Sequence, residues 1–457
     1  MSLRALAVLL LLLVAVVAAL WWLPGKPEAE KDAAPKEEPV TALAASDVVA
    51  IELTRGVQHL RLERRPELGW VLTQPVLAEA RTEAAEALLR GVLDARVRRV
   101  LEPRLAEAEN ATYGLAPPEA MVTLVPAKAG TAPVRVRLGG ASPVSADRYA
   151  QDDRGRLLLV DATLATSLDT SAENLEERRL VPVPAQEIAG IAVQRPDGEV
   201  RLRREGPGWK MQVPVADDAD AGDADAWARL LSGLERSRRL RDTEEARAGT
   251  ELEQPEVRVT VTLAGGKTLP DLALAALGPM GTKDDPERYA GRAARLPGAA
   301  PVRGPVPAST VTDLLRPAAA LRDPRVASFD VPEVREAWIR EGAHELALVR
   351  SGETWTARED GKPAAIPEAA AVAAWLDRVR LLHASDFAPA GTSVVAARSV
   401  TVTLASGKSL TVEIGAASGE RVLVRGSLRP AAVAWVSREA VPPWPVRVAD
   451  LKAAAGA

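Results

Sequence analysis

Hydrophobic and polar positions follow a pattern along the chain that occurs three times. Each occurrence centres on a tryptophan, at Trp70, Trp209 or Trp355, and two segments of alternating apolar and polar residues precede it. Such alternation predicts antiparallel strands joined as a hairpin. After each tryptophan, apolar residues recur at helical spacing, which predicts a helix with one buried face. These predicted helices cover residues 82–100, 224–240 and 367–382.

Further strands and a closing helix complete each repeat. Residues 259–263 and 400–404 share the sequence Val-Thr-Val-Thr-Leu, and residues 122–124 occupy the same place in the first copy. An amphipathic segment then closes each copy. It covers residues 161–180, is shorter at 309–321, and is degenerate at 446–452. The order predicts the α+β class, with three tandem α+β modules built on antiparallel sheets at residues 46–184, 185–330 and 331–457, the last one truncated.

The N-terminus begins with an apolar run. Every residue from Ala5 to Leu23 is apolar, and at about 1.5 Å per residue a helix of this length spans about 28 Å of hydrocarbon. Residues 1–23 are therefore predicted to form a single transmembrane signal anchor, with Arg4 on the cytoplasmic side and the bulk of the chain exported. A cleaved secretory signal is the alternative. Residues 24–45, rich in proline and mixed charges, predict a flexible linker.

The amino-acid composition excludes several classes of binding and catalytic function. Lys and Arg total 58 against 62 Asp and Glu, a net charge of -4, which lacks the basic excess of a nucleic-acid-binding protein. Cysteine is absent and histidine occurs three times, so disulfides and thiolate catalysis are excluded. Any metal or acid–base chemistry must then rest on carboxylates. No catalytic residues and no cofactor are predicted.

One acidic segment is a weak calcium candidate. Asp218, Asp220, Asp223 and Asp225 place carboxylates at the close spacing that calcium prefers. The bidentate glutamate that ends an EF-hand loop is missing, because a count from Asp218 ends at Arg229. A solvated helix entry, favoured by capping and by the helix dipole, is the preferred interpretation.

Two other features have a functional and a structural interpretation. The tripeptides at 266–268 and 407–409 resemble the end of a phosphate-binding loop but lack its first glycine, so hairpin turns are predicted and nucleotide binding is not. The tryptophans Trp70, Trp209 and Trp355 could form an array of sugar-stacking platforms. Since each opens a strand between a hairpin and a helix, core packing is preferred.

Several short motifs resemble a known family. They are Gly69-Trp70 before Pro75, Tyr113-Gly114-Leu115 before Pro117-Pro118, and Asn174-Leu175 before Arg178-Arg179-Leu180. Together with the apolar N-terminus they resemble an uncharacterised bacterial family of membrane-anchored repeat proteins, domain-of-unknown-function family 4340. Members tend to be encoded beside auxiliary components of ABC transporters similar to those of gliding motility. The resemblance implies a role in the bacterial cell envelope and brings no active site.

These observations lead to a functional hypothesis. The chain is expected to be a non-catalytic scaffold or accessory protein of the bacterial inner membrane, anchored through residues 5–23, with its bulk in the periplasm or otherwise extracytoplasmic. Its expected partners are ABC-transporter or other envelope proteins, and neither nucleic acid nor nucleotide. The alternative is an exported glycan-binding protein or a carboxylate-dependent hydrolase, whose two acidic residues would meet at a junction between modules.

Overall fold

The computed structural model describes residues 38–276, 280–281, 286–389 and 391–456. The predicted anchor at residues 1–23, and the linker as far as residue 37, lie outside these ranges. Within them, no helix has both the length and the apolar character needed to cross a membrane. The chain divides into two compact units, one ending at Glu177 but including Ala294–Ala300, the other formed by Arg178–Ala293 and Pro301–Ala457.

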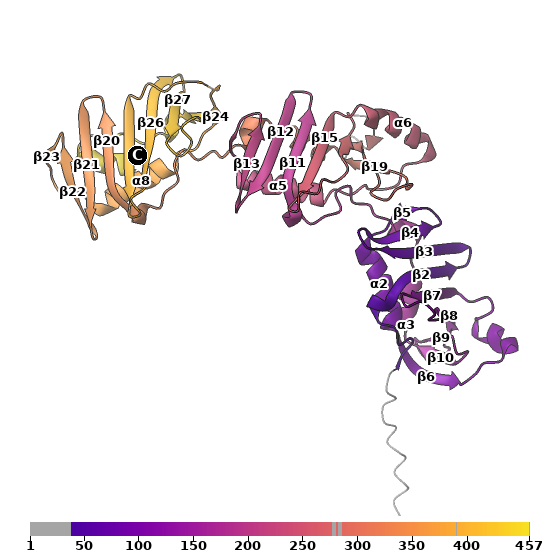
Figure 1. Cartoon of the computed structure of the whole chain (residues 1–457). Helices are drawn as coiled ribbons and strands as arrows, with labels where there is room; N and C mark the ends of the chain where they lie inside the picture. Colours follow the sequence, from indigo (N-terminus) through magenta and orange to yellow (C-terminus); the bar gives the residue numbers. More distant parts are fainter. Residues whose placement is uncertain (1–37, 277–279, 282–285, 390, 457) are drawn as a thin grey trace, which may run out of the picture. The chain divides into compact units, whose positions relative to one another are not determined.

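The first unit contains a ten-stranded antiparallel sheet with the order β1-β6-β10-β9-β8-β7-β2-β3-β4-β5 (Figure 1). Its strands are β1 (Glu38–Pro39), β2 (Val48–Arg55), β3 (Gln58–Arg65), β4 (Gly69–Gln74), β5 (Ala78–Glu79), β6 (Arg96–Glu102), β7 (Ala120–Pro126), β8 (Val134–Ala141), β9 (Arg148–Gln151) and β10 (Leu157–Val160). Its helices are α2 (Thr82–Leu93), α3 (Ala162–Leu168) and α4 (Ala172–Leu175), with 3-10 turns at Ala45–Asp47 and Glu107–Tyr113.

The second unit contains two nine-stranded antiparallel sheets. One has the order β14-β13-β12-β11-β15-β16-β18-β17, with β19 also paired to β18. Its elements are β11 (Ile188–Arg195), β12 (Gly198–Glu205), β13 (Gly208–Val213), β14 (Asp217–Asp218), α5 (Ala221–Ser232), α6 (Asp242–Glu253), β15 (Val257–Leu263), β16 (Leu272–Leu274), β17 (Met280–Gly281), β18 (Pro286–Arg292), β19 (Val302–Pro307) and α7 (Ala308–Leu314), with 3-10 turns at Ala185–Glu187 and Ala318–Leu321.

The other sheet of this unit has the order β23-β22-β21-β20-β25-β26-β27-β28-β24. Its elements are β20 (Val334–Glu341), β21 (His344–Ser351), β22 (Thr354–Glu359), β23 (Lys362–Pro363), α8 (Ala369–Arg380), β24 (Asp386–Phe387), β25 (Arg398–Leu404), β26 (Ser409–Ser418), β27 (Arg421–Gly426), β28 (Val433–Ser437) and α9 (Asp450–Gly456), with 3-10 turns at Val331–Glu333 and Arg438–Ala440. In all three sheets the strand that opens the repeat, β2, β11 or β20, lies between its hairpin partner and the later strand β7, β15 or β25.

The predicted α+β class is wrong. Of the residues that the structure describes, 41% lie in strands and 23% in helices, so the architecture is dominated by antiparallel sheet. The helix expected over residues 82–100 ends at Leu93, and the chain continues as strand β6. The closing segment 161–180 breaks into the two short helices α3 and α4.

The predicted helix over residues 82–100 was too long for a physical reason. In β6, Val97 is buried while Arg98 and Arg99 are exposed, and the strand pairs with β10, with Val97 opposite Val160. Short runs of apolar residues satisfy helical and strand spacing equally well, and pairing with a strand distant in sequence decides between them.

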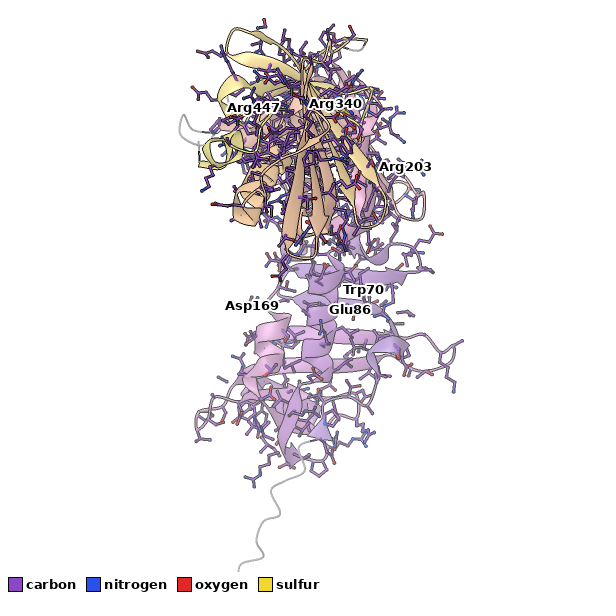
Figure 2. The ribbon with its side chains drawn as sticks, turned by 90° about the vertical axis from the view of Figure 1, so that its left-hand side faces the viewer. Trp70, Glu86, Asp169, Arg203, Arg340 and Arg447 are labelled. Atoms are coloured by element: carbon purple, nitrogen blue, oxygen red, sulfur yellow. The ribbon has the colours of Figure 1, made fainter. Side chains whose placement is uncertain are left out.

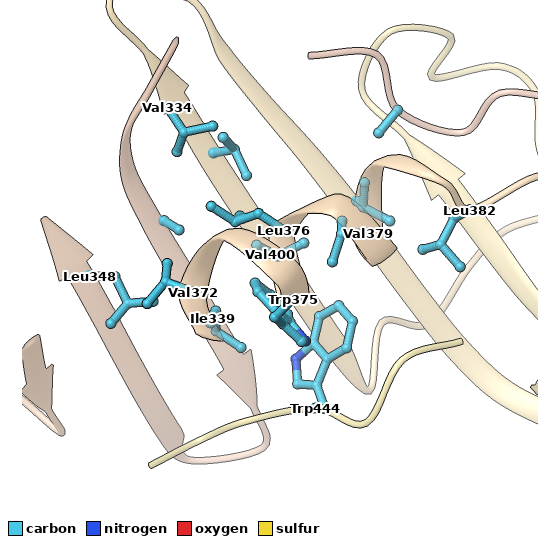
Figure 3. Close-up of a cluster of buried hydrophobic side chains, with 14 of the residues drawn as sticks. Val334, Ile339, Leu348, Val372, Trp375, Leu376, Val379, Leu382, Val400 and Trp444 are labelled. Carbon is cyan, nitrogen blue, oxygen red and sulfur yellow. The ribbon is translucent and has the colours of Figure 1, made fainter. Parts of the chain in front are cut away.

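A buried helix stripe and one sheet face form each core. In the third repeat, Val372, Trp375 and Val379 of α8 pack onto Ile339 and Val400 of the sheet (Figure 3). The rings of Trp375 and Trp444 meet edge to face, with centroids 5.6 Å apart. Their indole nitrogens donate to the carbonyl oxygens of Pro443 at 3.0 Å and of Arg340 at 3.1 Å. The large rings are thus buried with their polar atoms satisfied.

Truncation of this core should destabilise the third repeat strongly. We expect Trp375→Ala to lower the free energy of unfolding by about 3–5 kcal/mol, because it removes a fully buried ring and leaves a cavity. Trp338→Ala is the matched control, since Trp338 lies half-buried on the opposite face of the same sheet. Urea denaturation followed by circular dichroism measures both. Equal losses would contradict the assignment of Trp375 to the core.

Candidate functional site

The repeat tryptophans lie in the cores. Trp70, Trp209 and Trp355 are 1%, 2% and 4% exposed, which confirms the core-packing interpretation. An array of sugar-stacking platforms is thereby ruled out for these three rings, because stacking needs an accessible ring face.

In the first two repeats the tryptophan belongs to a charged triad. The indole nitrogen of Trp70 donates to Glu86 at 2.7 Å, and Arg64 donates to the same oxygen at 2.6 Å (Figure 2). In the second repeat Trp209 donates to Asp225 at 2.8 Å and Arg204 donates at 2.7 Å. Each guanidinium lies over the ring, 4.8 Å from its centroid in the first case and 4.5 Å in the second.

The third repeat keeps only part of the triad. Arg350 lies 6.0 Å from the centroid of Trp355. The position that follows the tryptophan by the same interval holds Ala371 in place of a carboxylate. Sequence reasoning missed the triad, although the signal was present: an acidic residue stands 16 positions after the tryptophan in the first two copies. The triad ties strand β4 or β13 to the following helix and is structural.

The calcium candidates are distributed over separate contacts. Asp225 belongs to the triad, Asp218 pairs with Lys210, and Asp223 pairs with Arg316 at 2.9 Å. Asp220 caps helix α5 by accepting the amide of Asp223 at 2.9 Å, as expected for a helix entry. Among the described residues, no group of three or more acidic or histidine side chains is arranged to hold a metal ion.

The two Gly-Lys tripeptides form hairpin turns, as predicted. Gly266 and Gly407 have φ angles of +79° and +81°, which glycine adopts without strain. The amide of Leu263 donates to the carbonyl of Lys267 at 2.8 Å, and that of Leu404 donates to Lys408 at 2.9 Å. These bonds close a tight turn of the kind that joins adjacent strands.

A buried ion cluster lies where the second and third repeats meet, within one compact unit. The side chain of Asp217 is 4% exposed and pairs with Arg322 at 2.6 Å and with Arg429 at 3.2 Å. Arg429 also donates to the backbone carbonyls of Asp323 at 2.7 Å and Arg325 at 2.6 Å. The guanidinium of Arg322 stacks 3.6 Å from the ring of Phe387. Buried charges are tolerated only when they are completely paired. The cluster therefore holds in place the segment that connects the second repeat to the third.

The sheet faces opposite the helices, here called the open faces, carry different side chains in the three repeats. In the first repeat, Glu52 and Glu63 on this face both form ion pairs with Arg61, so the positive charge of Arg61 has counterions within the repeat. In the third repeat, Trp338 lies at the position equivalent to Glu52, opposite Ala347 and Thr401. In the second repeat the equivalent residue is Ala192, opposite Arg201 and Thr260.

The small residue in the second repeat leaves a groove. It has a volume of about 610 Å³, and its lining includes Gly190, Ala192, Arg201, Arg203, Thr260 and Thr262. The groove lies along the open face of β11, β12 and β15. Sequence reasoning did not find it, because an alanine in an alternating strand carries no signal until the neighbouring strands are known.

These features describe a chain of strand-dominated repeats with conserved cores and divergent open faces. Residues 70–255 match the family model of a domain of unknown function (DUF4340), which confirms the resemblance to that uncharacterised family. The match begins at the core tryptophan of the first repeat and extends past helix α6 of the second. No curated protein and no solved structure matches the chain.

The triad predicts a pH-dependent contribution to stability. The hydrogen bond from Trp209 lowers the pKa of the Asp225 carboxyl, burial opposes this effect, and Arg204 lowers the pKa further. A lowered folded-state pKa stabilises the fold above the unfolded value of about 3.9, and this contribution is lost as the pH falls through the folded-state pKa. We therefore expect Asp225→Asn to destabilise near neutral pH by about 1 kcal/mol or less, since the site is partly exposed.

Urea denaturation at a series of pH values tests this expectation. The difference between wild type and Asp225→Asn should shrink as the pH falls below about 4. Glu251→Gln, which removes an exposed pair with Arg247 on helix α6, is the control. A difference that stays constant down to acid pH would contradict the role of the charged carboxylate.

The ion cluster predicts a protected linker between the second and third repeats. We expect Arg429→Ala to speed tryptic cleavage after Arg322 and Arg325 and to lower stability by about 1–3 kcal/mol, because it leaves Asp217 with one fewer partner and two carbonyls without a donor. Arg425→Ala is the matched control, since Arg425 pairs with Glu413 on an accessible part of the same repeat. Unchanged cleavage in Arg429→Ala would contradict this role.

Proposed function

We propose that the chain is a non-catalytic, membrane-anchored extracytoplasmic scaffold or accessory protein. The observation that carries this proposal is the open sheet face, opposite the helices, whose side chains differ from repeat to repeat. Helices and buried side chains cover one face of each sheet, while the other presents Glu52, Ala192 or Trp338 at one equivalent position. A repeat need only retain its core to fold, so the accessible face is free to be adapted to partners.

The arrangement of charges supports a binding role over a catalytic one. General acid–base catalysis needs carboxyl groups whose environments separate their pKa values. Here Glu86, Asp217 and Asp223 each accept from at least one arginine. These carboxylates are engaged in structural ion pairs, which suits a protein that acts by surface recognition. The alternative of a glycan-binding protein based on Trp70, Trp209 and Trp355 has lost its support with the burial of these rings.

The location of the protein follows from the N-terminal sequence. The apolar run from Ala5 to Leu23 supports an anchor in the bacterial inner membrane, with Arg4 in the cytoplasm and the repeats on the periplasmic side. The resemblance to membrane-anchored repeat proteins supports ABC-transporter components or an envelope assembly as partners. In this proposal the anchor concentrates the repeats near the membrane subunits that they bind.

In-cell crosslinking tests the proposal. The tagged full-length protein is crosslinked, solubilised from membranes, and its captured proteins are identified by mass spectrometry. We expect reproducible capture of ABC-transporter membrane subunits or other envelope proteins. A variant lacking residues 46–184 is the control for a contact through the first repeat. Recovery of the protein alone, or with glycan fragments only, would refute the scaffold function.

A further inference from the structure

The groove of the second repeat differs from its counterparts in a way that suggests a ligand. In the first repeat, Glu52 lies opposite Arg61 in the register of β2 and β3, and Glu63 follows Arg61 on the same face. Both carboxylates pair with Arg61, the second at 3.0 Å. The open face of the first repeat therefore supplies its own counterions.

The second repeat keeps the arginine and lacks both carboxylates. In the register of β11 and β12, Ala192 lies opposite Arg201, as Glu52 lies opposite Arg61. The position of Glu63 is taken by Arg203, which is exposed and lies opposite Gly190. Figure 2 labels Arg203. Arg201 retains one exposed ion pair, with Glu199 at 2.6 Å.

The charge of the groove follows from these replacements. Arg201 and Arg203 project from alternate positions of β12 to the same face, and Glu199 and Glu205 stand two positions before and after them. Of these two glutamates, Glu199 forms an ion pair with Arg201. No carboxylate among the described residues lies within ion-pair distance of Arg203. The hydroxyl of Thr260 on the far side donates to Asp271 at 2.6 Å, which leaves its oxygen free to accept. The groove thus combines positive charge with hydroxyl acceptors.

The third repeat shows that this combination is specific to the second. Ala347 and Val349 replace the two arginines, and Trp338 stands at the position that Ala192 has in the second repeat, so an indole takes the place of a methyl group. Among the described residues, the second repeat alone combines this space with an arginine, Arg203, that has no carboxylate within ion-pair distance.

We propose that this groove binds an extended acidic peptide segment of a partner protein. A carboxylate of the peptide takes, in front of Arg201, the place that Glu52 takes in front of Arg61, and a second carboxylate pairs with Arg203. Charge-assisted contacts of this kind are stronger than neutral hydrogen bonds and give geometric specificity. This inference deepens the scaffold function and rests on it for the existence of a protein partner.

The shape and lining favour a peptide over an acidic glycan. The residues that line the groove include no aromatic ring on which a sugar could stack. The floor of Gly190 and Ala192 allows a main chain to approach closely. Gln194 and Gln212 at the margins offer amides that can pair with peptide groups.

Peptide binding to the full-length protein in detergent tests the proposal. The probe is a fluorescent peptide of about eight residues with alternating Glu and Ala, long enough to cross the groove at about 3.3 Å per residue. We expect a rise in anisotropy that weakens with salt, as surface ion pairs do. A peptide with Gln in place of Glu should bind at least about tenfold more weakly.

The decisive variant is Ala192→Glu, which restores the internal counterion of the first repeat. We expect it to weaken binding of the acidic peptide by about tenfold or more, because the new carboxylate takes the place in front of Arg201 and its side chain fills the groove. The fold tolerates glutamate at the equivalent Glu52. Thr401→Glu, at the position of the third repeat equivalent to Thr260, is the control and should leave binding unchanged.

Several outcomes would overturn the proposal. They are absence of peptide binding at low salt, equal binding of the Glu and Gln peptides, unchanged binding in Ala192→Glu, or binding of oligogalacturonate in preference to the peptide. The scaffold function is tested separately from the groove, and its failure can be told apart from the failure of peptide binding. If Ala192→Glu still captures its partners in cells, the scaffold stands and the groove is not the contact. If the peptide binds but no partner is captured, the groove stands and the scaffold function does not.

Discussion

Burial of a tryptophan with its indole nitrogen hydrogen-bonded is the constraint on which the first two repeats depend. The ring at position 70 or 209 closes the core between a hairpin and a helix, and its N–H would be costly to bury without an acceptor. Glu86 and Asp225 provide that acceptor from the following helix, and an arginine of the hairpin completes the pair. One interaction therefore sets the strand, the helix and their relative rotation.

The three repeats have similar cores and different surfaces. Leu53, Val193 and Ile339 occupy the same buried position on the strand that opens each repeat. The open-face position directly before this buried residue holds Glu52, Ala192 or Trp338. A core residue is limited by packing on all sides, so a change of volume is costly. A residue on the open face meets solvent and has no such limit, so three copies of one fold can carry three different surfaces.

The ends of the repeats are built by a shared pattern of backbone bonds. In the first unit the amide of Glu177 donates to the carbonyl of Glu79 at 2.8 Å, and in the second unit Asp323 donates to Asp218 at 2.9 Å. The acceptors belong to the short edge strands β5 and β14. Pairing of the outgoing chain with such an edge satisfies polar groups that would otherwise attract foreign strands. At the end of the second repeat, the cluster of Asp217, Arg322 and Arg429 adds side-chain bonds to this arrangement.

The sequence by itself determined the repeat, the hairpins, the core tryptophans and the helix entry at Asp220, because local alternation, turn residues and capping act over a few positions. Only the tertiary structure decided that residues 96–102 form a strand, because their partner Val160 lies far along the chain. It also decided that Asp225 accepts hydrogen bonds from Trp209 and Arg204 instead of joining Asp218, Asp220 and Asp223 in a calcium site. The groove at Ala192 depends on the pairing of its strand with both β12 and β15. No local sequence pattern specifies the register between strands that are distant along the chain.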